Sequence, residues 1–132
     1  NYYDRLLAVT EKGDWTGWVD FFCAAVRAQA EENLARAQSL HSLYTQMRQR
    51  FVDVTRSQHA SSALDVFFQR PIVETPDFAA MGGFNNRMTA ANILRQLEEA
   101  GLITCVRRGA GRRPSRYAMM SIIRTAEGRR DL

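Results

Sequence analysis

The feature that most limits the fold of this chain is an uninterrupted stretch between Trp18 and Arg70 that contains neither proline nor glycine. Both residues weaken a helix, proline by removing a hydrogen bond and glycine by its conformational freedom. Apolar residues recur at spacings of three and four, which is typical of helices. They are Trp15, Trp18, Val19, Phe22 and Val26, and then Leu40, Leu43, Tyr44, Met47, Phe51 and Val54. The sequence predicts one long helix or two collinear helices, with residues 29–33 as the place for any bend.

A shorter helix is predicted before this stretch, over residues 2–10, with Gly13 at its carboxyl end. Asp14 then suits the amino-terminal cap of the long helix, because its carboxylate accepts from free backbone N–H groups. We expect residues 1–60 to form an all-helical unit. Aromatic side chains usually lie buried, so four of them are predicted to build its core: Trp15, Trp18, Phe21 and Phe22.

Shorter elements follow a polar, serine-rich segment at residues 55–62. The pattern predicts a helix from Ser62 to Phe68, an extended piece at 72–73, a helix capped by Thr75 and stopped at 82–83, and a helix from Asn85 or Asn86 to about Ala100. Strands are predicted at 102–106 and 117–119 around a glycine turn, followed by a helix at 121–126. The fold class is therefore mostly α with a small β-hairpin: a helical unit at 1–60, including the long helix, followed by a winged helix-turn-helix at 61–132.

Positive charge is concentrated at the end of the chain. Residues 104–132 hold eight basic and two acidic residues, whereas residues 1–60 hold seven of each. Five arginines fall in the predicted hairpin: Arg107, Arg108, Arg112, Arg113 and Arg116. Five guanidinium groups in one hairpin repel one another unless an anion offsets the charge, so we expect this wing to contact a phosphate backbone or an acidic protein surface.

The helix predicted to begin near Asn85 occupies the place of a recognition helix, whose first residues lie nearest the base edges of a major groove. The residues that we expect to contact DNA there are Asn85, Asn86, Arg87, Thr89 and Asn92, with Arg95 better placed for phosphate. Arginine pairs with guanine and asparagine with adenine. The alternative is that the two asparagines only cap the helix and that the remaining side chains form a solvated face.

Other function classes find little support in the sequence. Cys23 and Cys105 match no metal or redox spacing, and neither His41 nor His59 belongs to a catalytic constellation. We therefore expect no cofactor, no metal and no enzyme activity in this segment. No apolar run approaches the ~20 residues that span a bilayer, and no signal peptide opens the chain, so we expect a cytoplasmic protein without a membrane partner.

The first residues of the chain resemble a known family. The tyrosine pair Tyr2-Tyr3, the step Gly13-Asp14-Trp15, and Trp18 followed by Phe21-Phe22 resemble the region downstream of the catalytic core in bacterial Fic proteins. A helical segment and a winged helix commonly follow there, so the resemblance covers nearly the whole chain. The chain begins with Asn1 instead of methionine, which suggests a fragment of a longer polypeptide.

Fic proteins typically transfer AMP from ATP to a hydroxyl group of a target protein, using a loop of the form His-Pro-Phe-x-x-Gly-Asn-Gly-Arg. The chain has no His-Pro dipeptide, so no catalytic residue carries over to it. The resemblance implies a DNA-binding or regulatory carboxyl-terminal appendage that is not itself catalytic, with the upstream catalytic domain as a partner. The alternative is an interaction or dimerisation module that docks the catalytic core, its target or a second copy of the chain.

Overall fold

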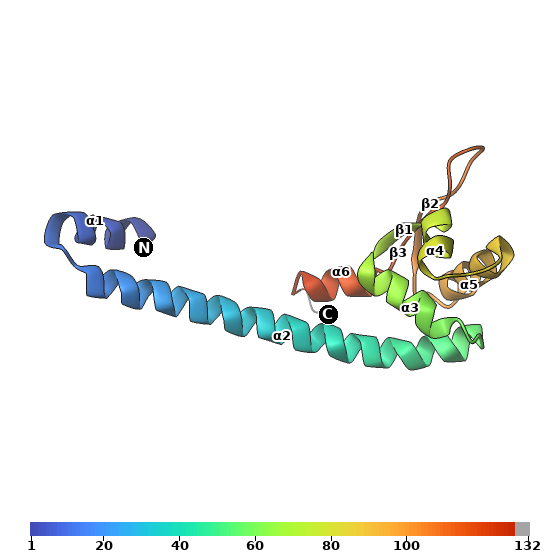
Figure 1. The fold of residues 1–132 in the computed structure, drawn as a ribbon, viewed down its shortest axis with the longest axis horizontal. Helices are drawn as coiled ribbons and strands as arrows, with labels where there is room; N and C mark the ends of the chain where they lie inside the picture. The colour runs from blue at the N-terminus through green and yellow to red at the C-terminus, as the bar shows by residue number, and fades with distance from the viewer. Residues whose placement is uncertain (129–132) are drawn as a thin grey trace. The chain divides into compact units, whose positions relative to one another are not determined.

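The structure, a computed structural model, describes residues 1–128 and divides into two compact units. The first unit is Asn1–Ala37 and the second begins at Gln38. Helix α2 (Trp15–Thr55) belongs to both and runs without interruption, so one long helix is present and not two (Figure 1). The division lies closer to the amino terminus than the expected boundary at 60, because the last part of α2 packs into the core of the second unit.

The first unit consists of α1 (Tyr2–Lys12) and the beginning of α2. Gly13 ends α1 in the left-handed conformation, with a φ of 65° that favours glycine. The Asp14 carboxylate accepts a hydrogen bond of 2.9 Å from the backbone N–H of Gly17, which is the cap predicted for α2. The end of α1 and the start of α2 are therefore determined by residues at those boundaries.

The predicted aromatic core of the first unit is wrong. No side chain in residues 1–37 is buried, and Trp15 and Phe22 are 64% and 58% exposed. Trp18 and Phe21 are half-buried, and the ring of Trp18 meets that of Tyr2 edge to face, with centroids 5.4 Å apart. Two helices cover only one face of each other, so the remaining apolar faces lie open to solvent.

The second unit contains the other helices and strands of the described chain. In order these are α3 (Ala60–Gln69), β1 (Ile72–Glu74), α4 (Thr75–Met81), α5 (Arg87–Glu99), β2 (Thr104–Arg107), β3 (Arg116–Ala118) and α6 (Met120–Ala126). The strands form an antiparallel sheet in the order β1-β3-β2. This is the arrangement of a winged helix-turn-helix, with α4 and α5 as the helix pair (Figure 1). We call β2, β3 and the loop 108–115 between them the wing. The predicted fold class, mostly α with a small β-hairpin, is confirmed.

A chain of aromatic rings forms the centre of the second unit. Phe51 of α2 contacts Phe67 of α3, Phe67 contacts Phe78 of α4, and Phe78 contacts Phe84, with centroid separations of 6.5, 5.6 and 5.0 Å. The first three rings are fully buried and Phe84 is 8% exposed. Gly82 passes so close to Phe84 that a Cβ there would lie 2.2 Å from its ring. These contacts fix the turn between α4 and α5.

Two predicted helix caps are wrong. Helix α3 begins at Ala60 and not at Ser62, because the turn after α2 is shorter than the polar composition of residues 55–62 suggests. Thr75 is the first residue of α4 and not its cap. Its hydroxyl instead donates to the carbonyl oxygen of Ser115 at 3.3 Å, and its backbone N–H donates to the same oxygen at 3.1 Å. Thr75 thus ties the start of α4 to the wing.

Candidate nucleic-acid interface

Helix α5 presents a polar face and buries the opposite one. Ala90, Ile93, Leu94 and Leu97 are buried, whereas Arg87, Asn92 and Arg95 are exposed and Thr89 is half-buried. Of the two asparagines before the helix, Asn86 is the cap: its side-chain oxygen accepts from the Met88 N–H at 2.8 Å. Asn85 is exposed and has no hydrogen bond among the described residues.

The acidic residues near α5 are engaged with arginines. Arg95 donates to Glu99 one turn along the helix at 3.0 Å, and Arg70 donates to Asp77 at 3.0 Å. Arg95 is therefore paired within the protein, whereas Arg87 has no ion pair among residues 1–128. The beginning of α5 is the part of the helix with an available positive charge.

The expectation that the wing arginines need an external anion is wrong for three of the five. Arg107 and Arg116 each donate to the same Glu74 oxygen, Oε1, at 2.7 Å. Arg108 pairs with Glu98 of α5 through both of its Nη atoms, and its Nη1 lies 3.0 Å from Oε2. Two carboxylates from elsewhere in the second unit thus offset charge that the hairpin by itself leaves unbalanced.

Sheet register explains how Glu74 reaches both of its partners. Arg116 on the central strand β3 lies opposite Glu74 on one side and opposite Arg107 on the other. A bulge between Cys105 and Arg107 inserts Val106, so that Arg107 takes the place opposite Arg116 that Val106 has in a regular ladder. Side chains in register on adjacent strands lie close enough to pair. The guanidinium groups of Arg116 and Arg107 accordingly hold the pKa of the Glu74 carboxyl below its ordinary value.

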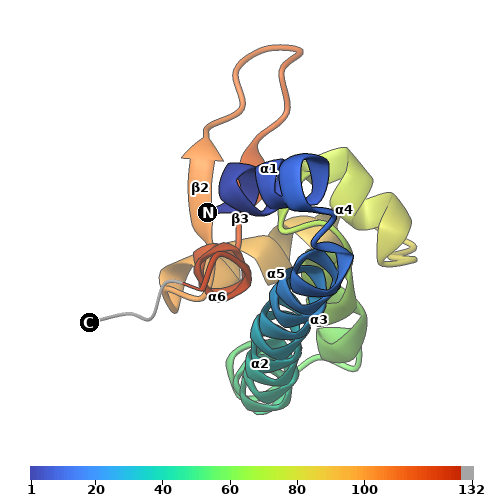
Figure 2. The same cartoon turned by 90° about the vertical axis from the view of Figure 1, so that its left-hand side faces the viewer.

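The tip of the wing carries the two remaining arginines. Arg112 and Arg113 are exposed and have no ion pair among the described residues. Ala110 and Arg113 exchange two backbone hydrogen bonds of 3.0 Å, and Gly111 between them has a φ of 58°. The tip is a closed turn that extends beyond the ends of β2 and β3 in both views (Figure 2). Its two guanidinium groups are available to a ligand.

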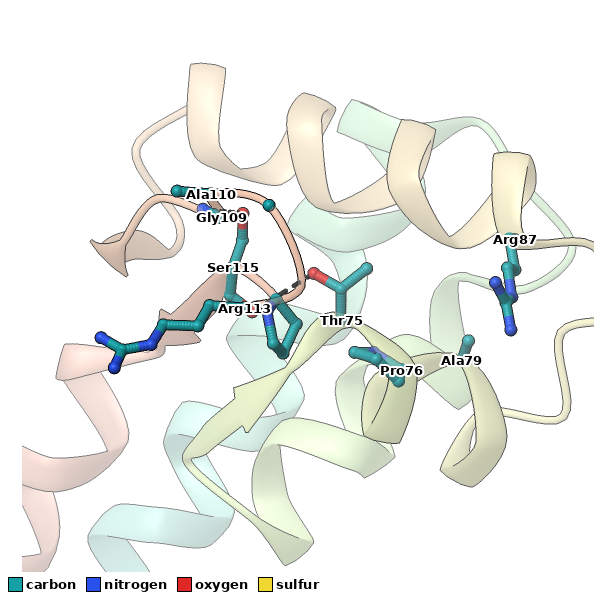
Figure 3. A pocket seen from close by; sticks show the side chains of 10 residues that line it. Thr75, Pro76, Ala79, Arg87, Gly109, Ala110, Arg113 and Ser115 are labelled. Carbon is teal, nitrogen blue, oxygen red and sulfur yellow. Dashed lines mark hydrogen bonds between the residues drawn. The ribbon is translucent and has the colours of Figure 1, made fainter.

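A cleft of about 500 Å³ separates the wing from the starts of α4 and α5. Its lining contains no carboxylate: Thr75, Pro76, Ala79, Arg87, Gly109, Ala110, Gly111, Arg113, Pro114 and Ser115. Figure 3 shows Arg87 and Arg113 at opposite sides of this group and the hydrogen bond from Thr75 to Ser115 between them. The Arg113 side chain extends away from Thr75 and Pro76 in Figure 3, so its guanidinium lies at the rim of the cleft, and backbone contacts hold the wing side in place.

Sequence reasoning missed Glu74, because a single acid in a short strand gave no sign of its partners 33 and 42 residues away. It also missed Met88, which is 66% exposed beside Arg87 on α5. The available signal for Met88 was an apolar residue in the first turn of the predicted helix, two positions after Asn86.

Residues 1–128 contain no group of three or more His, Cys, Asp or Glu side chains arranged to hold a metal ion. Within the same residues, no helix combines the length and apolar character needed to cross a bilayer. No protein-family model matches the chain, and a search of curated proteins finds no significant match.

Proposed function

We propose that the second unit is a non-catalytic module that binds duplex DNA. Helix α5 lies along a major groove with Arg87, Asn85 and Asn92 toward the base edges, and the wing tip contacts the phosphate backbone through Arg112 and Arg113. The observation that carries this proposal is the set of exposed arginines without an ion pair among the described residues: Arg87 and Arg113 line one cleft that has no carboxylate, and Arg112 lies beside Arg113 at the wing tip.

The arginines that are already paired take a smaller part in this proposal than the sequence suggested. Arg107, Arg108 and Arg116 each have an internal carboxylate, and Arg95 has Glu99. If these arginines bound phosphate, each would lose its internal ion pair and form another, so the binding free energy would gain little. We therefore assign DNA contact chiefly to the start of α5 and the wing tip, and this keeps the expected number of phosphate contacts small.

The experiment is a titration of the whole chain with a mixed-sequence duplex at several salt concentrations, for wild type and for Arg112→Gln/Arg113→Gln. Each phosphate contact contributes about 0.9 to the slope of log affinity against log salt. We expect the double variant to lower the magnitude of that slope by about 1.8 and to bind roughly 10- to 100-fold more weakly at 0.1 M salt. Salt-independent binding, or no binding at micromolar protein, contradicts the proposal.

A second candidate function, protein docking, is favoured by the open apolar face of the first unit. Its exposed apolar side chains are Tyr2, Tyr3, Leu6, Leu7, Trp15, Val19, Phe22, Val26 and Leu34. Many exposed apolar side chains within one small unit are typical of an interaction site. The partner in this candidate is a catalytic core, its target or a second copy. A stable dimer in sedimentation together with no affinity for duplex favours docking over DNA binding.

From the resemblance to Fic proteins we also propose that this segment follows an AMP-transferring domain in the same polypeptide. That domain would be the partner of the exposed apolar side chains of the first unit. The test is the coding sequence upstream of Asn1. A His-Pro-Phe loop of the Fic form in the same reading frame supports the proposal, and an upstream reading frame without that loop contradicts it.

A further inference from the structure

Glu74 occupies an unusual place in the second unit. It is the last residue of β1 and the residue directly before α4, where a side chain often caps the helix. Its carboxylate makes no capping hydrogen bond and instead accepts from Arg107 on β2 and Arg116 on β3. One carboxylate therefore joins the two strands at the base of the wing to the strand that leads into the helix pair.

Neighbouring contacts strengthen the same connection. Thr75, the next residue, bonds the Ser115 carbonyl oxygen through both its N–H and its hydroxyl. Arg107 also donates to the carbonyl oxygen of Pro114 at 3.2 Å, and the Ser115 hydroxyl accepts from the Gly109 N–H at 2.8 Å. The Ser115 end of the wing loop is thereby bonded to the start of α4, the Gly109 end is bonded to Ser115, and the Glu74 pairs add the charged contacts between β1 and the wing.

We propose that Glu74 is a positioning residue that holds the wing against the start of α4 and withholds Arg107 and Arg116 from nucleic acid. The proposal rests on the proposed DNA binding and assigns different roles to the wing arginines. Arg107 and Arg116 at the base stabilise the fold, and Arg112 and Arg113 at the tip contact the phosphate backbone. The side chains involved are 30% to 44% exposed, so phosphate reaches the base arginines once the carboxylate no longer holds them.

The test compares Glu74→Gln with wild type. Glutamine keeps the shape of the side chain and removes its charge, which frees two guanidinium groups for phosphate. We expect the salt slope of duplex binding to steepen by up to about 1.8, from two added contacts of about 0.9 each. Glu74→Asp keeps the charge and is expected to bring the slope back toward wild type. In the protein without DNA, hydrogen exchange of the Gly109 and Arg113 amides is expected to be several-fold faster in Glu74→Gln.

The matched control is Glu31→Gln, which changes the net charge equally and also releases one arginine, Arg27, from an exposed pair on α2. It is expected to leave the slope and the wing exchange unchanged. If wild type binds duplex and Glu74→Gln changes neither the salt slope nor the hydrogen exchange of the wing, the proposal that Glu74 positions the wing is overturned. If wild type does not bind duplex, the proposed function fails, and exchange in the wing alone decides whether Glu74 positions it.

Discussion

Asn86 and Asn85 are adjacent in the chain, but only Asn86 has a local structural task. Its side-chain oxygen accepts from the Met88 N–H at 2.8 Å at the start of α5. Loss of such a cap costs about 1 kcal/mol. We expect Asn86→Ala to lower the free energy of unfolding by this amount in urea denaturation, and Asn85→Ala to change it by less than about 0.5 kcal/mol.

The same pair of variants separates capping from base contact. Asn85 is exposed and makes no hydrogen bond within the described chain, so a loss of duplex affinity in Asn85→Ala reports contact with DNA and not a damaged helix. Equal destabilisation by both substitutions contradicts the assignment of Asn86 as the cap.

Glu74 also gives the fold a dependence on pH. Hydrogen bonds from Arg116 and Arg107 lower the pKa of its carboxyl in the folded protein below the ordinary 4.5. A carboxyl whose pKa is lower in the folded state stabilises that state fully above its unfolded pKa, and the contribution is lost as the pH falls through the folded pKa. We expect wild type to melt at a higher temperature than Glu74→Gln at neutral pH.

As the pH falls below 4.5, the difference in melting temperature between wild type and Glu74→Gln is expected to shrink. Thermal unfolding followed by circular dichroism between pH 7 and pH 3 measures this. A difference that stays constant over the whole range contradicts a stabilising ionised Glu74.

At the scale of elements, α2 offers a comparison within one helix. Phe51 is fully buried against Phe67, whereas Phe22 is 58% exposed. Removing a buried phenylalanine costs about 3 to 5 kcal/mol, from lost transfer free energy and the cavity that remains. We expect Phe51→Ala to lower the unfolding free energy by that amount and Phe22→Ala to change it by less than about 0.5 kcal/mol.

Chemical denaturation of the whole chain measures both Phe variants. A large cost for Phe22→Ala contradicts the open apolar face of the first unit and indicates that something covers it in solution. Repeating the measurement at several protein concentrations identifies a second copy as the cover, because the stability of an associating protein rises with concentration.

The wing is the element whose sequence was most misleading. Its arginine content predicted a uniformly basic surface, but the bulge at Val106 and the position of β1 direct Arg107 and Arg116 toward Glu74. Helix α5 in turn engages Arg108 through Glu98. Within the wing, the positive charge available to a ligand is therefore confined to Arg112 and Arg113 at the tip.

At the scale of the whole molecule, the proposed interface depends on where charge is placed and not on the net charge of +4. Arg27→Gln/Arg36→Gln removes the same two charges as the wing-tip double variant, but from α2 in the first unit, where both arginines pair with glutamates. We expect its salt slope for duplex binding to match wild type in the same titration. A fall equal to that of Arg112→Gln/Arg113→Gln indicates attraction by overall charge.

The order of elements and most of their boundaries followed from the sequence, because they depend on residues within one or two turns. Gly13 ended α1 and Asp14 capped α2 without help from distant contacts, and Gly82 and Gly83 marked the end of α4, which the packing of Phe84 then fixes. The winged helix-turn-helix order and the surface position of Arg87, Arg112 and Arg113 were predictable for the same reason.

Only the tertiary structure decided which arginines are free and which aromatics are buried. The pairs from Glu74 join residues 33 and 42 positions apart, and they exist because three strands meet in one sheet in a particular register. Burial likewise depends on what lies opposite a helix face, so the same apolar spacing placed Phe51 in a core and left Phe22 in solvent. The local sequence pattern determines the helices and strands. Charge neutralisation and burial depend on residues that are distant in the sequence and that only the folded structure brings close.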